Sequence, residues 1–383
     1  MNLDILDPKN FVDVRKPYLE ASGLPGYCYT SEDWYRREIE TIFMKDWILV
    51  GRADQIPNVG DYIVEDICGE AVMVVRDNHH QIRALSPICR HRGTPIVSEN
   101  GSCRLLTCPY HGWTYALEGD LIKAPQMDQA IDFDMTQYEL PAIRLESWAG
   151  FLFVNFDSNA RALRETLGSL PRIMERYKLD DMVVARNKTY MLDCNWKLYI
   201  DNTIEIMHVP YVHRNTIQKI GSRDTWVMEE SSDGAFLLYY GLFPGTLALM
   251  PGDEGFPPIA GLGESNVERH DIPVLLPNCH FLATSDFFWW QSHFPEGPER
   301  MRLEVNACFP RDRLEREDFE DVAARYYARL DRTNPEDNLA SERQHVGVRQ
   351  RSYRAGRYSH WEVLVHAFAN YVLDRVLDPA TED

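Results

Sequence analysis

The sequence predicts a mixed α+β protein in which a small all-β domain is inserted into a larger α+β domain. Short β-branched runs broken by turn residues fill residues 47–156, and Asp77-Asn78 suits a hairpin turn between two of them. Residues 157–383 mix strand-like and helix-like spacing and end in amphipathic segments, whereas residues 1–46 contain one helical segment. We therefore expect an N-terminal helical segment of the main domain (1–46), a β domain (47–156) and the rest of the main domain (157–383).

Local signals mark the expected elements of the first two ranges. Residues 30–46 are predicted to be helical, because Thr30 with Asp33 can form a capping box ahead of apolar residues at helical spacing. In the β domain, runs of β-branched and aromatic residues are separated by turn residues. The predicted strands of this domain include 47–50, 61–65, 71–75, 81–85 and 151–156.

The third range is predicted to alternate between helices and strands. Residues 196–208 have helical spacing that Pro210 should end, because proline breaks the helical hydrogen-bond ladder. Residues 251–273 are rich in Gly, Pro and charge and are expected to form a long loop. The other predicted helices are 161–177, 316–331, 336–349 and 360–376, and the predicted strands are 188–195, 235–243, 280–288, 289–294 and 301–309.

The composition limits the partners and the compartment. Among 383 residues, 40 Lys and Arg face 59 Asp and Glu, so the net charge of −19 argues against nucleic acid or an anionic membrane as a partner. No apolar run is long enough to span a bilayer, and the first residues lack a basic-then-apolar signal pattern. Eight cysteines are too few for a disulfide-stapled fold of this length. We therefore expect a cytoplasmic protein.

Two short segments carry the first group of candidate metal ligands, and they are here called the two arms: one contains Cys89 and His91, and the other contains Cys108 and His111. Each arm supplies one thiolate and one imidazole, and together they can close a metal site. Zinc would accept this set, and so would a two-iron, two-sulfur cluster with two Cys on one iron and two His on the other. Gly93 and Gly112 favour the cluster, because the backbone must approach inorganic sulfide closely. Cys103 lies outside the pattern and is expected to be a small buried residue. The four candidate ligands are Cys89, His91, Cys108 and His111.

The second constellation lies in residues 195–213. Glu205 and His208 are spaced to share one face of a helix, and Pro210 lets the chain turn so that His213 returns to the same side. Two imidazoles and one carboxylate make the facial triad of a non-haem Fe(II) site with open positions. Spacing alone leaves the carboxylate open. The candidates are Glu205, Asp201, Glu336, Asp337 and Glu342.

Together the two constellations resemble the oxygenase component, or α-subunit family, of Rieske non-haem iron oxygenases. The resemblance covers nearly the whole chain. It implies a Rieske domain inserted in a helix-grip (START-like) catalytic domain with an antiparallel sheet and C-terminal helices. It also implies one 2Fe-2S cluster on the two arms and one mononuclear Fe(II) per chain. By resemblance, His208 and His213 hold this iron with Asp337, since Glu336-Asp337 is followed by Gln344.

The same resemblance implies a role for the acid that precedes the first iron histidine. In the family this acid bridges the Rieske histidine of a neighbouring subunit to the iron-ligating histidine, and Glu205 occupies its place. Many ring-hydroxylating members carry Asp there, whereas Glu is similar to carnitine- and betaine-type oxygenases. Asn202, nearby on the predicted helix, is a further candidate catalytic residue.

The implied function is that of a terminal oxygenase in a multicomponent system. A ferredoxin or flavin reductase, or both, would deliver electrons from NAD(P)H, and O2 would be used to hydroxylate an aromatic substrate. The alternative is a monooxygenase that oxidatively demethylates or cleaves an N-methyl, quaternary ammonium or O-methyl substrate. By family analogy, the chain is expected to form a homotrimer or a multiple of one. Two other classes are a cluster-only electron carrier or iron sensor and a zinc-stabilised binding module.

Two further groups of residues bear on the substrate and the electron donor. Aromatic residues of the predicted sheet could stack a planar ring, cage a quaternary ammonium group or simply fill the core. They are Tyr239, Tyr240, Phe287, Phe288, Trp289 and Trp290. Arg90, Arg92 and Arg104 flank the two arms and could either dock an acidic electron donor or form a solvated surface.

Overall fold

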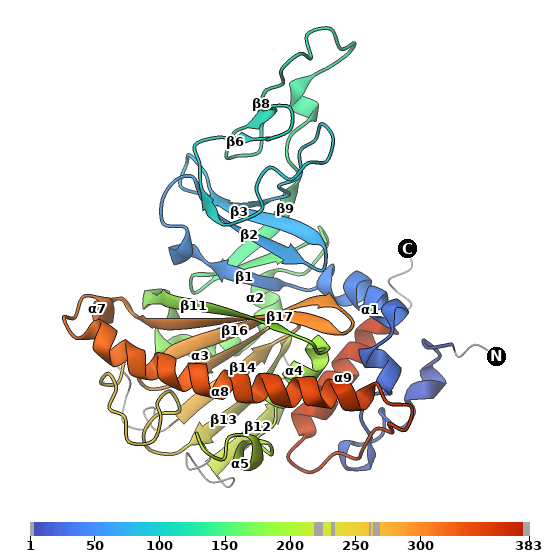
Figure 1. Ribbon diagram of the computed structural model, residues 1–383, viewed down its shortest axis with the longest axis vertical. Coiled ribbons are helices and arrows are strands. Elements are labelled where there is room, and N and C mark those ends of the chain that lie inside the picture. Colours follow the sequence, from blue (N-terminus) through green and yellow to red (C-terminus); the bar gives the residue numbers. More distant parts are fainter. Residues whose placement is uncertain (1–3, 218–224, 231–233, 260–261, 263–268, 378–383) are drawn as a thin grey trace. The chain divides into compact units, whose positions relative to one another are not determined.

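The computed structural model divides the chain into two compact units, which Figure 1 colours along the sequence. The structure describes residues 4–217, 225–230, 234–259, 262 and 269–377. One unit, Lys45–Leu163, is here called the β unit, and sequence analysis expected a β domain at 47–156. The other, called the α+β unit, combines Met1–Met44 with Arg164–Asp383. Within the described residues, no helix is long and apolar enough to cross a membrane.

The β unit is built from antiparallel strands. One sheet has the order β1-β10-β9-β4-β3-β2-β5, and a smaller one has the order β6-β7-β8. The strands are β1 (Ile48–Arg52), β2 (Asp61–Ile67), β3 (Glu70–Arg76), β4 (Ile82–Leu85), β5 (Gly101–Ser102), β6 (Leu106–Thr107), β7 (Thr114–Tyr115), β8 (Leu121–Lys123), β9 (Ala142–Trp148) and β10 (Phe151–Asn155). The hairpin turn predicted at Asp77 is confirmed, because the Asp77 carboxylate accepts the N–H groups of His79 and Gln81 between β3 and β4, each at 2.8 Å.

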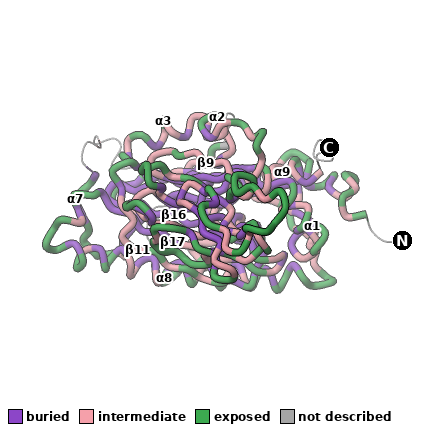
Figure 2. The backbone as a smooth tube through the Cα atoms, turned by 90° about the horizontal axis from the view of Figure 1, so that it is seen from above, coloured by how far each residue is buried: buried purple, intermediate pink, exposed green. Residues whose placement is uncertain are grey.

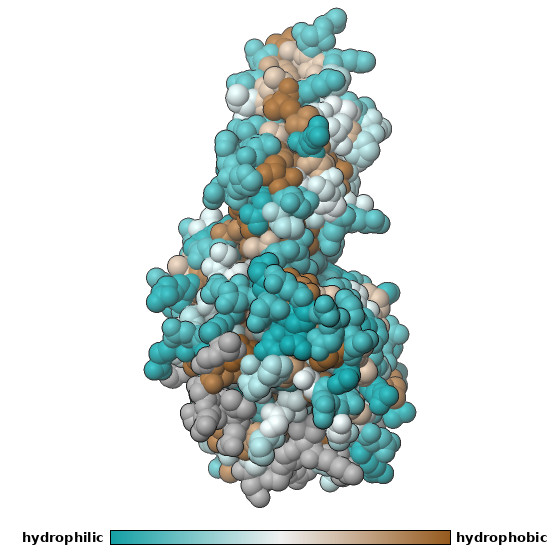
Figure 3. Space-filling model, turned by 90° about the vertical axis from the view of Figure 1, so that its left-hand side faces the viewer, coloured by the Kyte–Doolittle hydropathy of each residue, from teal (hydrophilic) through white to brown (hydrophobic). Residues whose placement is uncertain are grey.

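The core of the β unit includes both arm cysteines. Cys89 and Cys108 are buried in one apolar cluster with Leu106, Trp113 and Tyr115. Other apolar side chains of this unit stay on the surface, and Figure 3 shows apolar areas interrupting its hydrophilic face. The exposed ones are Val59, Leu105, Tyr110, Ile122, Ile131 and Met135. The unit therefore buries the thiols of Cys89 and Cys108 and also displays apolar surface of the kind that partners cover.

The α+β unit contains one antiparallel sheet with the order β11-β17-β16-β15-β14-β13-β12. Its long central strands β16 and β17 are mostly buried, as Figure 2 shows. The mixed α+β class with antiparallel sheets and C-terminal helices, predicted from sequence, is confirmed. The strands are β11 (Met182–Leu192), β12 (Trp226–Glu230), β13 (Phe236–Leu242), β14 (Arg269–Leu275), β15 (Cys279–Ala283), β16 (Phe288–Gly297) and β17 (Arg300–Pro310).

Helices accompany this sheet, and α4 contacts both α8 and β16. They are α1 (Glu32–Glu38), α2 (Leu163–Leu167), α3 (Leu170–Met174), α4 (Trp196–Thr203), α5 (Val209–Val212), α7 (Arg311–Leu314), α8 (Phe319–Val348) and α9 (Val363–Val376). The prediction of two tail helices, 316–331 and 336–349, is wrong, because α8 continues through Pro335. Proline removes one helical hydrogen bond, and burial of one face of α8, including Leu330 and Asn338, offsets that loss.

Several other expected boundaries also differ. The helix at 30–46 is capped by Ser31, which accepts the N–H of Trp34, and not by Thr30. The helix at 161–177 is broken between α2 and α3 at Gly168, whose φ of 52° lies in the left-handed region. Residues 269–273 of the expected loop belong to β14, and its residues 260–261 and 263–268 lie outside the described part. Apolar spacing alone could not locate these breaks.

A buried ion pair fixes the start of α4 to the N-terminal helix. Lys197 Nζ lies 2.6 Å from Glu38 Oε1, and neither side chain is exposed. The two Glu38 oxygens also accept the indole N–H groups of Trp34 (2.8 Å) and Trp196 (3.0 Å). Because all three donors share one carboxylate, α1 and α4 are held in a single arrangement.

We predict that Glu38→Gln lowers the free energy of unfolding by about 3–5 kcal/mol, because it leaves the Lys197 ammonium buried without a counter-charge. Urea unfolding of the purified protein would measure this change. Glu40→Gln is the matched control, since Glu40 is exposed and pairs with Arg37 at 3.7 Å on the surface. Equal stability of the two variants would contradict the prediction.

Candidate metal centres

The segment after α4 presents the two histidines of the second constellation. Asn195 begins α4 by accepting the N–H of Lys197 at 3.1 Å, and the helix ends at Thr203. Glu205 and His208 therefore lie in an irregular turn, and the prediction that they share one helix face is wrong. Pro210 does not end the helix but lies in the first turn of α5, where its missing N–H is not needed.

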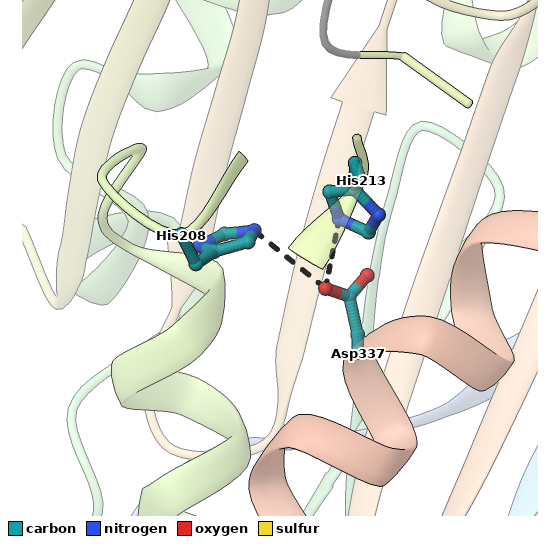
Figure 4. A group of neighbouring side chains, drawn as sticks. All are labelled: His208, His213 and Asp337. Carbon is teal, nitrogen blue, oxygen red and sulfur yellow. Dashed lines mark ion pairs between the residues drawn. The ribbon is translucent and has the colours of Figure 1, made fainter. Parts of the chain in front are cut away.

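Three of the candidate ligand side chains nevertheless lie close together. The carboxylate Oδ1 of Asp337 lies 2.9 Å from His213 Nε2 and 3.6 Å from His208 Nε2, and Figure 4 shows both imidazoles directed at it. Among the described residues, these three form the group of ligand-type side chains whose donor atoms all lie within 4.8 Å of one another. One carboxylate and two imidazoles around one point fit a mononuclear iron with open positions.

The second nitrogen of each imidazole is bound by a carboxylate. His208 Nδ1 lies 2.6 Å from Glu205 Oε1, and His213 Nδ1 lies 2.7 Å from Glu336 Oε2. Glu336 Oε2 also accepts the hydroxyl of Thr216 at 2.7 Å. With Nδ1 held in this way, both Nε2 atoms are left for a metal, and the imidazoles keep a fixed orientation.

The charges of the group support this arrangement. Burial raises the pKa of Asp337, but the hydrogen bond to His213 and the charges of both histidines outweigh burial and hold that pKa below its usual value. Burial also disfavours the charged form of His208, but the hydrogen bond that His208 donates to Glu205 and the negative charges of Asp337 and Glu205 together outweigh burial and raise the pKa of His208. Asp337 is therefore ionised, as a metal ligand must be.

The other candidate acids have different surroundings. The two carboxylate oxygens of Glu205 are hydrogen-bonded to His208 Nδ1 and to the N–H of Met207. Glu205 therefore does not face the triad as a third ligand. Asp201 is half-buried, and the desolvation of its carboxyl group raises its pKa to about 8. Glu342 accepts the N–H of Asp193 at 3.2 Å. Asn202 contacts the triad, because its Nδ2 donates to Asp337 Oδ1 at 3.1 Å.

In the β unit, the two arms form loops with the same hydrogen bonds. The N–H of Cys89 donates to the carbonyl of Thr94 (2.9 Å), and that of Gly93 donates back to the carbonyl of Cys89 (3.0 Å). The N–H of Cys108 donates to Trp113 (2.7 Å), and that of Gly112 donates to Cys108 (3.1 Å), in the same pattern. Both glycines have φ near +70°, the left-handed conformation that favours glycine.

The imidazoles at the tips of these loops lie side by side. The ring centroids of His91 and His111 are 4.7 Å apart, and His91 stacks on Trp113 at 4.9 Å. His91 Nδ1 is buried and has no hydrogen-bond partner among the described residues, which fits a metal ligand. Burial and the neighbouring His111 lower the pKa of His91, so its imidazole stays neutral.

The four arm ligands do not gather around a single point. No three of them meet the 4.8 Å criterion that the triad meets within the described residues. A zinc ion would draw its four ligands together at about 2.0–2.3 Å, whereas a two-iron cluster separates the Cys pair from the His pair. The structure therefore does not group these four residues into one compact set of donors, as a closed zinc site would. Tyr115 adds a hydroxyl 3.4 Å from Cys89 Sγ.

A cavity of about 150 Å³ adjoins the triad. Of the predicted aromatic cluster, Tyr239 and Trp289 line it, whereas Phe287, Phe288 and Trp290 are buried elsewhere in the core. Trp226 of β12 also lines the cavity. Sequence analysis missed Trp226 because it did not predict β12.

The residues around the two arms are solvent-facing. The three arginines Arg90, Arg92 and Arg104 are exposed, which both a docking rim and a solvated surface would require. Cys103 is only half-buried, so the expectation of a buried residue is not met in full. Its side chain still packs against the apolar core of the β unit.

Comparison with protein families identifies the class. A model of the ring hydroxylating alpha subunit (catalytic domain) matches residues 179–378, and a model of the Rieske [2Fe-2S] domain matches residues 46–144. The chain therefore belongs to the family of Rieske-type ring-hydroxylating α-subunits. This confirms the resemblance seen in the sequence, and with it the presence of one domain for a 2Fe-2S cluster and one for a mononuclear iron. The individual ligands of each metal stay predictions.

Two curated relatives are similar to this chain in sequence. The carnitine monooxygenase oxygenase subunit of Escherichia coli (strain K12) is 32% identical over 241 residues, 62% of this chain and 63% of that protein. This match thus spans less than two thirds of the relative's length. The glycine betaine monooxygenase oxygenase subunit of Pseudomonas aeruginosa (strain UCBPP-PA14) is 26% identical over 414 residues, covering 99% of this chain and 95% of that protein.

Solved structures have the same fold. The quaternary ammonium Rieske monooxygenase CntA in complex with its substrate L-carnitine has a TM-score of 0.80 at 25% identity, covering 96% of this chain and 99% of that one. Naphthalene 1,2-dioxygenase from Rhodococcus sp. bound to indole also reaches a TM-score of 0.80, at 21% identity and 97% coverage of both chains. At that identity the second match shows the fold alone.

We predict that Glu336→Gln lowers the affinity for Fe(II) by about 10- to 100-fold, because His213 loses the carboxylate that orients it. Iron content after equilibrium dialysis against a metal buffer would measure the change. Glu342→Gln is the matched control on the same helix, and its iron affinity should equal that of the wild type. Iron loss of the same size in both variants would refute a specific role for Glu336.

We also predict that His91→Ala or His111→Ala keeps the mononuclear iron but abolishes electron transfer to it, because the cluster loses a ligand. Visible absorption, electron paramagnetic resonance after dithionite and iron counting would follow the two metals separately. His79→Ala, an exposed histidine of the same unit, is the control. Turnover of either variant with NAD(P)H and a partner reductase would show the cluster assignment to be wrong.

Proposed function

We propose that this chain is the oxygenase subunit of a multicomponent Rieske monooxygenase that oxidises an N-methyl or quaternary ammonium compound. The observation that carries this proposal is the cavity beside the His208, His213 and Asp337 triad, in a chain whose relatives are named for carnitine and glycine betaine. Of the two substrate classes that the sequence left open, these relatives favour the N-methyl or quaternary ammonium compounds. Aromatic hydroxylation is the other candidate.

The lining of the cavity supports an ammonium substrate. The rings of Trp226, Tyr239 and Trp289 are electron-rich surfaces that attract a cation. The carboxylates of Glu205 and Asp337 also line the cavity, and they would offset the positive charge that a bound iron brings to that end. Tyr239 is held in place by its hydroxyl, which donates to the carbonyl of Thr203 at 2.7 Å. An uncharged arene would gain packing against the rings but no cation–π attraction.

The two metals have different roles in the proposed reaction. When bound, the Rieske cluster supplies electrons singly, and the mononuclear iron supplies the open positions at which O2 is activated. His208, His213 and Asp337 would hold that iron, while Glu205 and Glu336 keep both imidazoles oriented. Asn202 fixes the Asp337 carboxylate by donating to it. The apolar walls exclude water from the reacting carbon.

The proposal also includes partners and an assembly. Glu205 would bridge the imidazole of His208 to the Rieske histidine of a neighbouring subunit, which requires an oligomer, and by family analogy this oligomer is a homotrimer or a multiple of one. The exposed apolar side chains of the β unit support burial against another subunit. A ferredoxin or flavin reductase would supply the electrons, and the exposed Arg90, Arg92 and Arg104 offer it a basic surface. Eight cysteines in 383 residues are too dilute for a disulfide framework, which supports a cytoplasmic location.

Oxygen uptake by the purified protein with a reconstituted reductase would test the proposal. We predict consumption of O2 and NAD(P)H with trimethylammonium compounds and release of an amine and an aldehyde, because a hydroxylated carbon next to nitrogen breaks its C–N bond. The Asp337→Ala variant should abolish both the consumption of O2 and NAD(P)H and the release of products. Product formation from simple arenes alone would favour the aromatic candidate.

A further inference from the structure

The cavity wall away from the triad carries a buried cation. Arg329 of α8 is 6% exposed and lines the cavity. Its Nε donates to the carbonyl of Leu247 at 2.9 Å, its Nη1 donates to the Thr333 hydroxyl at 2.8 Å, and its guanidinium lies 5.2 Å from the centre of the Trp289 ring. These partners position the guanidinium, but none of them carries a formal negative charge.

Arg329 therefore lacks a counter-ion among the described residues. No carboxylate of these residues lies within 4.0 Å of it, although arginines elsewhere in the chain pair with acids, as Arg186 does with Asp331 at 2.8 Å. Burial lowers the pKa of Arg329 to about 10, which still leaves it charged at neutral pH. A buried charge without a partner is strongly unfavourable. A charge kept in this state on the wall of a cavity suits an anionic ligand.

A second polar group beside Arg329 also lacks a partner. Asn334 is buried and lines the same cavity, and its Oδ1 accepts the Gln291 amide at 3.2 Å. Its Nδ2 has no hydrogen-bond partner among the described residues. Because Trp289 and Gln291 alternate along β16, they share one face of the sheet, and they contact Arg329 and Asn334 respectively. Both unsatisfied groups are donors, so the missing ligand is an acceptor.

Helix α8 sets the order of these groups along the cavity, because Asn334 lies less than one turn before Asp337 and Arg329 lies about two turns before it. Arg329, Thr333 and Asp337 are four residues apart in turn and lie along one face of the helix. Eight residues span about 12 Å along a helix axis. The cavity is therefore polar at both ends, with carboxylates at the triad and donors at Arg329.

We propose that the substrate is a zwitterion, with its ammonium group toward the triad and a carboxylate bound by Arg329 and Asn334. Two donors of a guanidinium and an amide match the two oxygens of a carboxylate, and such charge-assisted hydrogen bonds are strong and directional. This inference rests on the proposed function and adds to it that a simple cationic alcohol or amine is a poor substrate. Arg329 acts as a specificity-determining residue and takes no part in the oxidation itself.

Paired ligands test this inference. Glycine betaine is compared with choline, and carnitine with its methyl ester, because each pair keeps the trimethylammonium group and removes the carboxylate charge. Binding to the iron-loaded protein is measured by calorimetry, and kcat/KM is measured by oxygen uptake. We expect the zwitterion of at least one pair to bind and react about 10- to 100-fold better than its partner.

Variants separate charge from structure. Arg329→Gln should remove the preference for the zwitterion, and Arg329→Lys should restore part of it. Arg325→Gln is the matched control, because Arg325 lies one turn earlier on α8 and is exposed, and it should keep the wild-type ratio. Circular dichroism and the Rieske spectrum would confirm that each variant is folded.

The outcomes of this experiment distinguish the two proposals. Wild-type protein that binds and oxidises the uncharged-tail compounds as well as the zwitterions would overturn the inference and leave the proposed function intact. So would a preference that Arg329→Gln does not change. Failure of every ammonium compound, together with turnover of an aromatic carboxylate that depends on Arg329, would overturn the proposed function and keep the anion site.

Discussion

The iron site depends on the alignment of one long helix with a short irregular segment. Asp337 lies in the middle of α8, whereas His208 and His213 flank a single turn of helix after α4. α8 contacts both α4 and α5, so the carboxylate arrives opposite the two Nε2 atoms. The buried pair of Lys197 and Glu38 in turn fixes the start of α4. Loss of any of these contacts would spread the three ligands apart.

The same helix gives the cavity two chemically different ends. Its residues Glu336 and Asp337 bring negative charge to the histidines, and Arg329, two turns earlier, brings a positive one. Helical geometry keeps these groups at a fixed separation, because each turn advances about 5.4 Å. A rigid helix that holds both the metal ligand and the anion-binding residue would present the substrate in one orientation.

Local sequence was sufficient to predict those residues of both metal sites that lie close together in the chain. Each arm around Cys89 and Cys108 is a closed loop with hydrogen bonds over five residues, so its spacing already encodes its shape. The choice of Asp337 came only through family resemblance, because spacing could not separate it from Glu336 next to it. The role of Glu336 on His213 was missed for the same reason, since it depends on which way two adjacent side chains point.

Residue order was enough to predict the α+β class, the β domain with its two Cys and His arms, and the pair of histidines after α4. These features arise from periodicity and short-range motifs, which the order of residues contains directly. Three other features became visible in the folded chain: α8 runs through Pro335, Trp226 lines the cavity, and Arg329 is buried there without a counter-ion among the described residues. Those properties depend on which faces pack together across distant segments, and packing is set by the whole fold rather than by any local stretch.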